Sequence, residues 1–346
     1  MTLYGKTTSV RHRRAGRFFL CLAALIASGC SQQPIRLFGE AQGTYYSIQY
    51  YDRRGRDLQP QVDSLLHAFD LTASLWVDSS LLRRLNAGTT DTVDALFTDL
   101  LEHSLSITEY TDGAFDPRIG RIVQAWGFSF RQQQEPDSAE LAVMLAAARG
   151  RVAVSDGRLI KECPATELDF NAIAQGYAVD LLAAMLERYG ITNYLVDVGG
   201  EVIARGGKPD GSPWRVGIER PAADSISAPE VQTAVPLRNA AIVTSGSYRK
   251  YYERDGIRYS HTIDPATGRP VQHSLLSASV IDSLCWRADA MATAYMVMGL
   301  DSARRFIAAH PGGPGTAAVF FIYDSCGTLC SYATPSFEQT IKQNNL

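Results

Sequence analysis

The chain has 346 residues, of which 46% are hydrophobic and 20% charged, an ordinary globular composition that allows one large domain or two medium ones. The net charge is −3, and residues 1–29 hold five basic residues and no acid, so the remainder carries −3 − 5 = −8. An acidic body argues against nucleic acid as the main partner, since phosphate binding draws on clusters of lysine and arginine.

The first 29 residues are predicted to be an export signal. A basic segment, RHRRAGR, precedes the apolar run FFLCLAALIA, which is too short to cross a membrane as a helix. Ala27, Ser28 and Gly29 before Cys30 resemble a bacterial lipoprotein box, which implies cleavage before Cys30 and lipid on its sulfur. The alternative is an ordinary signal peptide with an incidental cysteine. Residues 30–42 are then expected to be a tether.

The four cysteines of the remaining chain show no spacing typical of a zinc site. Cys326 and Cys330 bracket the segment Gly-Thr-Leu, so they could form the disulfide that export permits, or stay as two thiols.

The first half of the chain predicts one strand, three helices and one hairpin. The strand lies at 44–52, where TYYSIQYYD alternates and is rich in aromatic residues. Apolar residues at helical spacing predict helices at 60–71, 92–110 and 139–150. An Asp-Gly turn inside RVAVSDGRLIKE predicts the hairpin, at 151–162.

The second half mixes helices and strands without a regular alternation. A helix is predicted at 172–190, with Gly190 at its end, and one or two helices at 288–312. Strands are predicted within 193–207 and 214–221, and a hairpin at 316–334. This order favours an α+β fold over a doubly wound α/β fold.

Several motifs carry residues suited to chemistry. TDGAFDPRIG places a Gly-Ala-Phe-Asp-Pro turn after a helix, Asp169 stands where a helix begins, and VDVGGEV has paired glycines that allow a ligand close to the backbone. His261 precedes a rigid Ile-Asp-Pro turn. Asp289 and Thr293 in RADAMAT are spaced i and i+4 on one helix face, and their oxygens are hard ligands suited to Mg²⁺.

Each motif also has a structural alternative: a simple turn, a helix N-cap, a β-bulge, a structural histidine and a solvated helix face. Neither the GxGxxG fingerprint of dinucleotide-binding folds nor the P-loop pattern is present.

Taken together and in this order, the motifs resemble the ApbE family of FAD:protein FMN transferases, from about Gly43 to about Tyr332. The resemblance rests on GTYYSI, SLWVDSSLLRRLN, TDGAFDPRIGRIVQAWGF, DFNAIAQGYAVD, NYLVDVGGEV, SGSYRKYY, YSHTIDPATGRP and ADAMATAYMVMG. It implies an α+β, T-fold-like architecture of two lobes with the flavin nucleotide between them. The transferase domain is then expected at 43–335, followed by a C-terminal tail at 336–346.

The activity that the resemblance implies is Mg²⁺-dependent transfer of the FMN half of FAD to a Thr or Ser hydroxyl of an acceptor protein, with release of AMP. The acceptor is expected to be a membrane redox protein. The enzyme is expected to be exported and lipid-anchored to a bacterial cell membrane, facing the periplasm or the cell exterior. The alternatives are an Mg²⁺-dependent FAD pyrophosphatase, which yields FMN and AMP, and a flavin-binding lipoprotein without catalysis.

The resemblance also assigns site residues. The metal-binding positions are the carbonyl of Ala172 and the side chains of Asp289 and Thr293. The positions expected to contact the flavin nucleotide are Gln42, Trp76, Ala114, Phe115, Asp116, Asp169, Gln175 and Ile263. Gln175 replaces the family's usual Lys, which removes a positive charge from the vicinity of the phosphates.

His261 is expected to be the catalytic base, because its ordinary pKa near 6.5 leaves the ring largely neutral at pH 7. Asp264 and the Pro265 turn would fix the orientation of the ring, and Asp264 is the second candidate for the base. In the structural alternative, His261 only caps the hairpin.

Overall fold

The computed structural model describes residues 33–128, 136–221, 230–247, 251–254 and 257–342. The predicted signal segment and Cys30 therefore lie outside the described residues. Within the described ranges, no helix has both the length and the apolar character needed to span a membrane.

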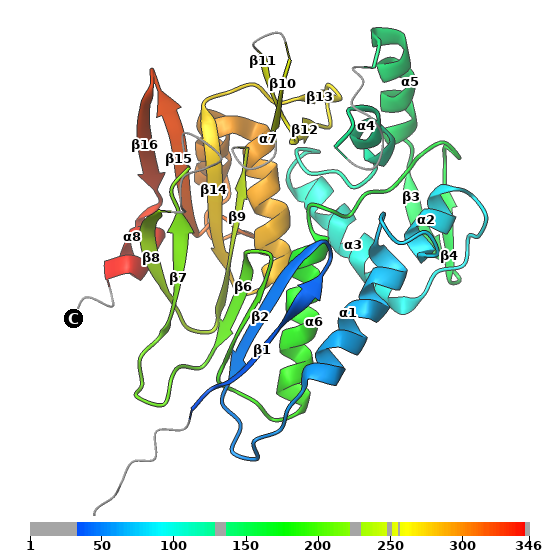
Figure 1. The fold of residues 1–346 in the computed structure, drawn as a ribbon. Coiled ribbons are helices and arrows are strands. Elements are labelled where there is room, and N and C mark those ends of the chain that lie inside the picture. Colours follow the sequence, from blue (N-terminus) through cyan, green and yellow to red (C-terminus); the bar gives the residue numbers. More distant parts are fainter. Residues whose placement is uncertain (1–32, 129–135, 222–229, 248–250, 255–256, 343–346) are drawn as a thin grey trace, which may run out of the picture. The chain divides into compact units, whose positions relative to one another are not determined.

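One antiparallel sheet of eight strands organises the folded unit, which starts at Gln32 (Figure 1). In spatial order the strands are β1 (Ile35–Ala41), β2 (Thr44–Tyr50), β5 (Tyr194–Val198), β6 (Glu201–Arg205), β9 (Ala240–Gly246), β14 (Leu275–Asp282), β15 (Ala318–Ser325) and β16 (Thr328–Ala333). Strands β1 and β16 form the two edges. The predicted strand at 44–52 and the predicted hairpin at 316–334 are confirmed.

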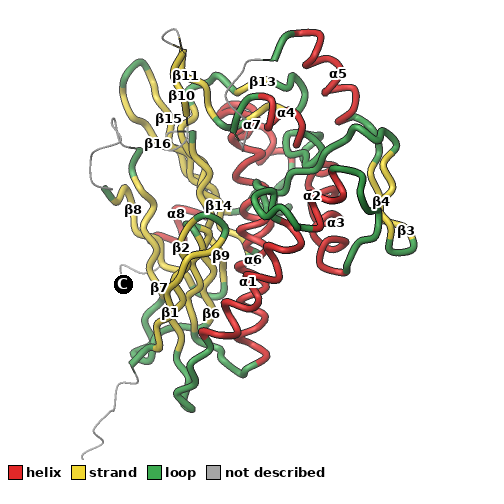
Figure 2. The backbone as a smooth tube through the Cα atoms, turned by 45° about the vertical axis from the view of Figure 1, so that its right-hand side comes forward, coloured by secondary structure: helices red, strands yellow, loops and turns green. Residues whose placement is uncertain are grey.

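Helices cover one face of the sheet, as Figures 1 and 2 both show. Helices α1 (Gln59–Ala73), α6 (Ala174–Arg188) and α7 (Cys285–Ala309) lie directly on it, and α2 (Leu81–Asn86) and α3 (Ala95–Tyr110) pack on α1 and α7. The hairpin of β7 (Trp214–Glu219) and β8 (Val231–Leu237) and helix α8 (Pro335–Lys342) cover the opposite face.

Smaller elements complete the described part of the chain. They are α4 (Gly120–Ala125), α5 (Ser138–Ala148), the hairpin of β3 (Val152–Ser155) and β4 (Arg158–Lys161), the pair β10 (Tyr251–Arg254) and β11 (Ile257–Ser260), and the pair β12 (Ile263–Asp264) and β13 (Arg269–Pro270). The Asp156-Gly157 turn predicted for the β3–β4 hairpin is present, with φ of 50° and 70°.

The sheet is hydrophobic on both faces because both are covered. In β15, Val319 and Phe321 point into the core beneath the helices, while Phe320 and Ile322 join the core beneath α8. Successive side chains of a strand point to opposite faces of the sheet. A strand that is covered on both faces therefore has a continuous run of apolar residues in its sequence. The prediction of an α+β fold is confirmed.

Two boundaries differ from the sequence expectations, and the expectation of one or two helices at 288–312 is confirmed. Residues 35–41 of the expected tether form edge strand β1. The expected tail contains most of α8, whose Phe337 is fully buried and stacks on Phe320 at a ring distance of 5.1 Å. The region at 288–312 is one run of helix interrupted at Gly299, which has φ of 71° and ψ of 168°.

The four cysteines in the described part of the chain are free thiols, so the structure contains no disulfide between Cys326 and Cys330. Cys326 lies in the turn between β15 and β16, whereas Cys330 lies within β16 and pairs with Tyr323.

Candidate active site

A close crossing of α6 and α7 places the two predicted metal-binding side chains. A Cβ atom on Gly176 would lie 2.6 Å from the carbonyl oxygen of Cys285 and 2.8 Å from Cβ of Asp289, so only glycine fits at this point of α6. The Gly176 N–H donates to Oδ2 of Asp289 at 3.0 Å. The crossing therefore fixes the Asp289 carboxyl against the start of α6.

Asp289 is not a solvated surface residue, because only 5% of it is exposed. Burial raises the pKa of its carboxyl to about 7, and the hydrogen bond from Gly176 opposes that rise only partly. One helical turn further on, the Thr293 hydroxyl lies 3.3 Å from the Oγ of Ser245 on β9. The i, i+4 spacing thus places both side chains on one face of α7, with Asp289 against the start of α6 and Thr293 beside β9.

The segment before α6 carries a second buried carboxyl. Oδ1 of Asp169 accepts the N–H of Asn171 at 2.7 Å, and the Asp169 N–H donates to the carbonyl of Pro117 at 2.8 Å. Oδ2 of Asp169 is buried and has no hydrogen-bond partner among the described residues. Burial raises the pKa of this carboxyl to about 6.

Asp169 does not act as the N-cap of the helix, since α6 begins only at Ala174 after a turn. Ala172 belongs to this turn and is partly buried beside the main core. The structural alternative of a simple N-cap is therefore wrong for Asp169.

Two tight turns border the same end of α6. Gln42 (φ 55°) and Gly43 (φ 71°) connect β1 to β2, and both polar atoms of the Gln42 side chain are buried with no partner among the described residues. Gly199 connects β5 to β6, and its N–H donates to the Tyr45 carbonyl at 3.0 Å. A Cβ on Gly199 would lie 2.7 Å from Nε2 of Gln175, so the paired glycines leave room for that amide.

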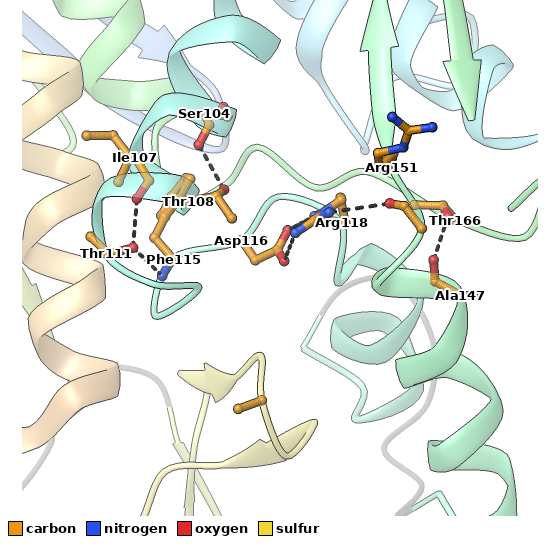
Figure 3. A network of polar contacts seen from close by, with 12 residues as sticks. Ser104, Ile107, Thr108, Thr111, Phe115, Asp116, Arg118, Ala147, Arg151 and Thr166 are labelled. Carbon is orange, nitrogen blue, oxygen red and sulfur yellow. Dashed lines mark hydrogen bonds and ion pairs between the residues drawn. The ribbon is translucent and has the colours of Figure 1, made fainter. Parts of the chain in front are cut away.

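The turn after α3 is held by polar contacts that Figure 3 displays. The Asp116 carboxylate binds Arg118 with both oxygens, at 2.8 Å to Nε and 2.7 Å to Nη2. Arg118 also donates to the carbonyl of Gly150 at 3.3 Å. The Asp116 carboxylate therefore stabilises the turn through its two hydrogen bonds with Arg118. The sequence motif alone did not identify Arg118 as its partner.

Two of the predicted nucleotide contacts have buried side chains. Phe115 is 3% exposed in the main core, and the partly buried Ala114 packs against that core. Ile263 is 4% exposed in a separate core that includes Trp126 and Leu141. Their side chains hold the two turns in place, and their contact with a nucleotide stays a prediction. Trp76, by contrast, is 58% exposed.

The turn that follows His261 is rigid, as the sequence predicted. Oδ1 of Asp264 accepts the Ala266 N–H and Oδ2 accepts the Thr267 hydroxyl, both at 2.9 Å. The Gly268 N–H donates to the Asp264 carbonyl at 2.7 Å, and the indole N–H of Trp126 donates to the Gly268 carbonyl, also at 2.7 Å. Asp264 thus shapes this turn with its own oxygens, and the partly buried His261 stands at its start.

The described residues contain no group of three or more His, Cys, Asp and Glu side chains that could bind a metal.

These features define an α+β protein in which Oδ2 of Asp169 and the Gln42 amide are buried near the start of α6 with no hydrogen-bond partner among the described residues. The chain belongs to the ApbE family, whose model matches residues 42–320.

Curated relatives carry the name FAD:protein FMN transferase. The chain is 36% identical to the one from Vibrio cholerae over 289 residues, covering 80% of this chain and 85% of the relative. It is 35% identical to the one from Escherichia coli K12 over 345 residues, covering 93% and 96%.

Solved structures are similar over nearly their whole length. The flavin transferase ApbE from Vibrio cholerae superposes with a TM-score of 0.77 at 33% identity, covering 89% of this chain and 99% of that one. The apo form of the flavinyl transferase ApbE from Pseudomonas stutzeri gives 0.78 at 32% identity, covering 90% and 98%.

The buried carboxyls predict how the ligand-free protein responds to pH. Burial raises the pKa of Asp289 to about 7 and those of Asp169 and Asp180 to about 6. Between about pH 4 and pH 7 the folded state therefore holds more protons than the unfolded chain, and the free energy of unfolding falls as the pH rises. The lowered pKa values of Asp52 and Asp282 act in the opposite direction, but only under more acidic conditions.

We expect the thermal midpoint of the ligand-free protein to fall between pH 5 and pH 8, and the Asp289→Asn variant to show a shallower fall because it has no ionisable group at that position. Differential scanning calorimetry in matched buffers measures both. A variant with the same slope as the parent would contradict the assignment of a raised pKa to Asp289.

Proposed function

We propose that this protein transfers the FMN half of FAD to a Thr or Ser hydroxyl of an acceptor protein and releases AMP. The observation that carries the proposal is the α6–α7 crossing, where a buried carboxyl and a hydroxyl stand one helical turn apart beside turns with unpartnered polar atoms. The relatives' names supply the reaction, and the motif series, in which Gln175 replaces the usual Lys, supplies the residues.

The oxygen atoms at the crossing fit Mg²⁺. Among the described contacts, the Asp289 carboxyl accepts a hydrogen bond from the Gly176 N–H; burial disfavours its ionised form, and a bound cation would favour that form. Asp289, Thr293 and the Ala172 carbonyl are hard oxygen donors of the kind that Mg²⁺ prefers. When bound there, the ion would neutralise charge on the diphosphate.

The protein's own groups then bind the nucleotide and move one proton. The Gln42 amide offers a donor and an acceptor to the nucleotide, and Oδ2 of Asp169 offers an acceptor. His261 accepts the proton of the acceptor hydroxyl as its oxygen bonds to the phosphorus of the FMN half. The bond from that phosphorus to the bridging oxygen breaks, and the electron pair leaves with AMP.

Intact-mass measurement of a candidate acceptor tests the proposal. After incubation with FAD and Mg²⁺, the acceptor is expected to gain one covalently bound FMN, and AMP to appear in equal amount. Free FMN with an unmodified acceptor would identify the pyrophosphatase alternative instead, and bound FAD without AMP would identify a carrier.

We also propose that the mature protein is exported and held to a bacterial membrane by lipid on Cys30, and that the acceptor is a membrane redox protein. The support is the basic and apolar segment before Ala27, Ser28 and Gly29. Mass spectrometry of the native amino terminus tests the anchor, because a cleaved and lipidated Cys30 has a mass that an unprocessed chain lacks.

Gln175→Lys is expected to tighten FAD binding. The Gln175 amide lies beside the backbone of Gly199, and an ammonium in its place would attract the diphosphate. One partly screened charge pair is worth on the order of 1 kcal/mol, about a fivefold lower Kd. Calorimetry at low and high salt measures the gain, which should shrink as salt rises. The uncharged Gln175→Met serves as the matched control, and a Lys variant that binds no better than Met would refute the electrostatic explanation.

A further inference from the structure

The interruption of α7 at Gly299 divides this helix into two segments. The first segment carries Asp289 and Thr293, and Met296 lies three residues after Thr293, near the end of that segment. The last carbonyl oxygens of a helical segment lack the N–H donors that the next turn would supply. A group from outside the helix is therefore needed to satisfy them.

His273 supplies such a group. Its Nε2 lies 2.7 Å from the carbonyl oxygen of Met296. A carbonyl oxygen only accepts, so this ring nitrogen carries the hydrogen. A Cβ on Gly299 would lie 3.0 Å from Cδ2 of the ring, which shows that the imidazole sits directly against the interruption.

The backbone next to His273 is tied to the turn that follows His261. The Val271 N–H donates to the Thr262 carbonyl at 3.0 Å, and β12 and β13 pair through Ile263 and Pro270. Only Gln272 separates Val271 from His273. One side chain thus connects the segment that carries the proposed base to the helical segment that carries the proposed metal-binding oxygens.

We infer that His273 is a positioning residue, which holds the Asp289–Thr293 segment of α7 in register with the His261 turn through its hydrogen bond to Met296. The expected effect on catalysis rests on the proposed function. The hydrogen bond from His273 to Met296, and its effect on the position of α7, do not depend on the reaction. Residues spaced by three, four and seven lie on one helix face, so a shift at Met296 is transmitted to Thr293 and Asp289.

The chain offers a matched control in the same helix. Nδ1 of His310 lies 2.9 Å from the carbonyl of Phe306, at the end of the second segment of α7. His310→Ala therefore removes the same type of hydrogen bond from the same helix, but on the segment without Asp289 and Thr293. His273→Gln keeps an N–H donor and serves as the conservative variant.

The experiment compares the parent, His273→Ala, His273→Gln and His310→Ala. Two measurements test the hydrogen bond between His273 and Met296 without requiring turnover. They are hydrogen exchange over residues 285–298 and Mn²⁺ binding to the FAD-loaded protein. Steady-state transfer gives kcat and the KM for FAD. For His273→Ala we expect faster exchange over 285–298, weaker Mn²⁺ binding and a kcat lower by about tenfold, the effect of about one lost hydrogen bond, with KM for FAD nearly unchanged.

Recovery of exchange, Mn²⁺ binding and kcat in His273→Gln, with His310→Ala altering exchange only after Gly299, would support the inference. Parental exchange and parental Mn²⁺ binding in His273→Ala would overturn it, as would a Gln variant as impaired as the Ala variant. If the Ala variant does not fold, His273→Phe, which keeps a ring but has no N–H to donate, takes its place in the same comparison with His273→Gln. Absence of transfer in the parent would overturn the proposed function, and the exchange and Mn²⁺ readouts would still test the hydrogen bond between His273 and Met296.

Discussion

Replacing Asp289 with Asn is expected to lower FMN transfer by about a hundredfold or more while the protein stays folded. The side chain is the one carboxylate among the proposed metal-binding groups, and a cation that stabilises a phosphoryl transition state contributes several kcal/mol, where each 1.36 kcal/mol is tenfold in rate. Asn is nearly isosteric and still offers an oxygen to the Gly176 N–H. Turnover at saturating FAD over a range of Mg²⁺ concentrations measures the loss.

Asp180→Asn is the matched control for this variant. Asp180 is another carboxyl whose pKa burial raises, and its Oδ2 accepts the N–H of Trp286 at 2.8 Å, at the start of α7. Its removal changes the buried charge of the same helix pair without touching the proposed metal-binding oxygens. We expect it to keep the Mg²⁺ dependence of the parent. Equal losses in the two variants would mean that Asp289 acts through buried charge alone.

His261→Ala is expected to slow transfer by roughly 10² to 10⁴, the usual range for loss of a general base, and to leave FAD bound. The parent should lose activity as the pH drops below roughly 6 to 7, because a protonated imidazole cannot accept the hydroxyl proton. That acid limb should vanish in the variant. The pH dependence of kcat/KM, with FAD affinity measured separately, is the decisive measurement.

The Asp264→Asn variant tests whether Asp264 serves as the catalytic base or only shapes the turn after His261. Both carboxylate oxygens of Asp264 accept hydrogen bonds inside the turn, and Asn can keep one of them. We expect this variant to lose much less activity than His261→Ala and to retain the acid limb. A His261→Ala enzyme with the parental rate and the parental acid limb would show that His261 is only a structural cap.

The elements of this fold could be predicted from local patterns, but the contacts that build its site could not. Alternation predicted the strand that became β2, and the 3.6-residue period predicted α1, α3 and α6. The spacing of Asp289 and Thr293 placed them on one helix face, but only the crossing at Gly176 determines that this face is buried. A glycine inside a helix carries no local sign of the helix that will pack against it.

Long-range contacts, which local sequence patterns do not reveal, also explain why helix α8, the turn after Asp169 and the buried Gln42 amide were not predicted. Residues 336–342 have too few apolar side chains to predict a packed helix, and Phe337 becomes buried because strand β15 presents Phe320 to it. Asp169 precedes a helix and resembles an N-cap, yet the backbone turns once more before α6 begins at Ala174. Unpartnered atoms such as those of Gln42 are recognisable only when all neighbours are in place.

The direction of edge strand β1 has a consequence for the proposed lipid anchor. The strand starts at Ile35, only five residues after the proposed lipid-bearing Cys30, and ends next to Gln42 at the site. Seven residues of strand span about 24 Å. If Cys30 carries the proposed lipid, the anchor and Gln42 are separated along the chain by the whole length of β1, so the anchored end of the sheet and the end that bears Gln42 are opposite ends of one strand.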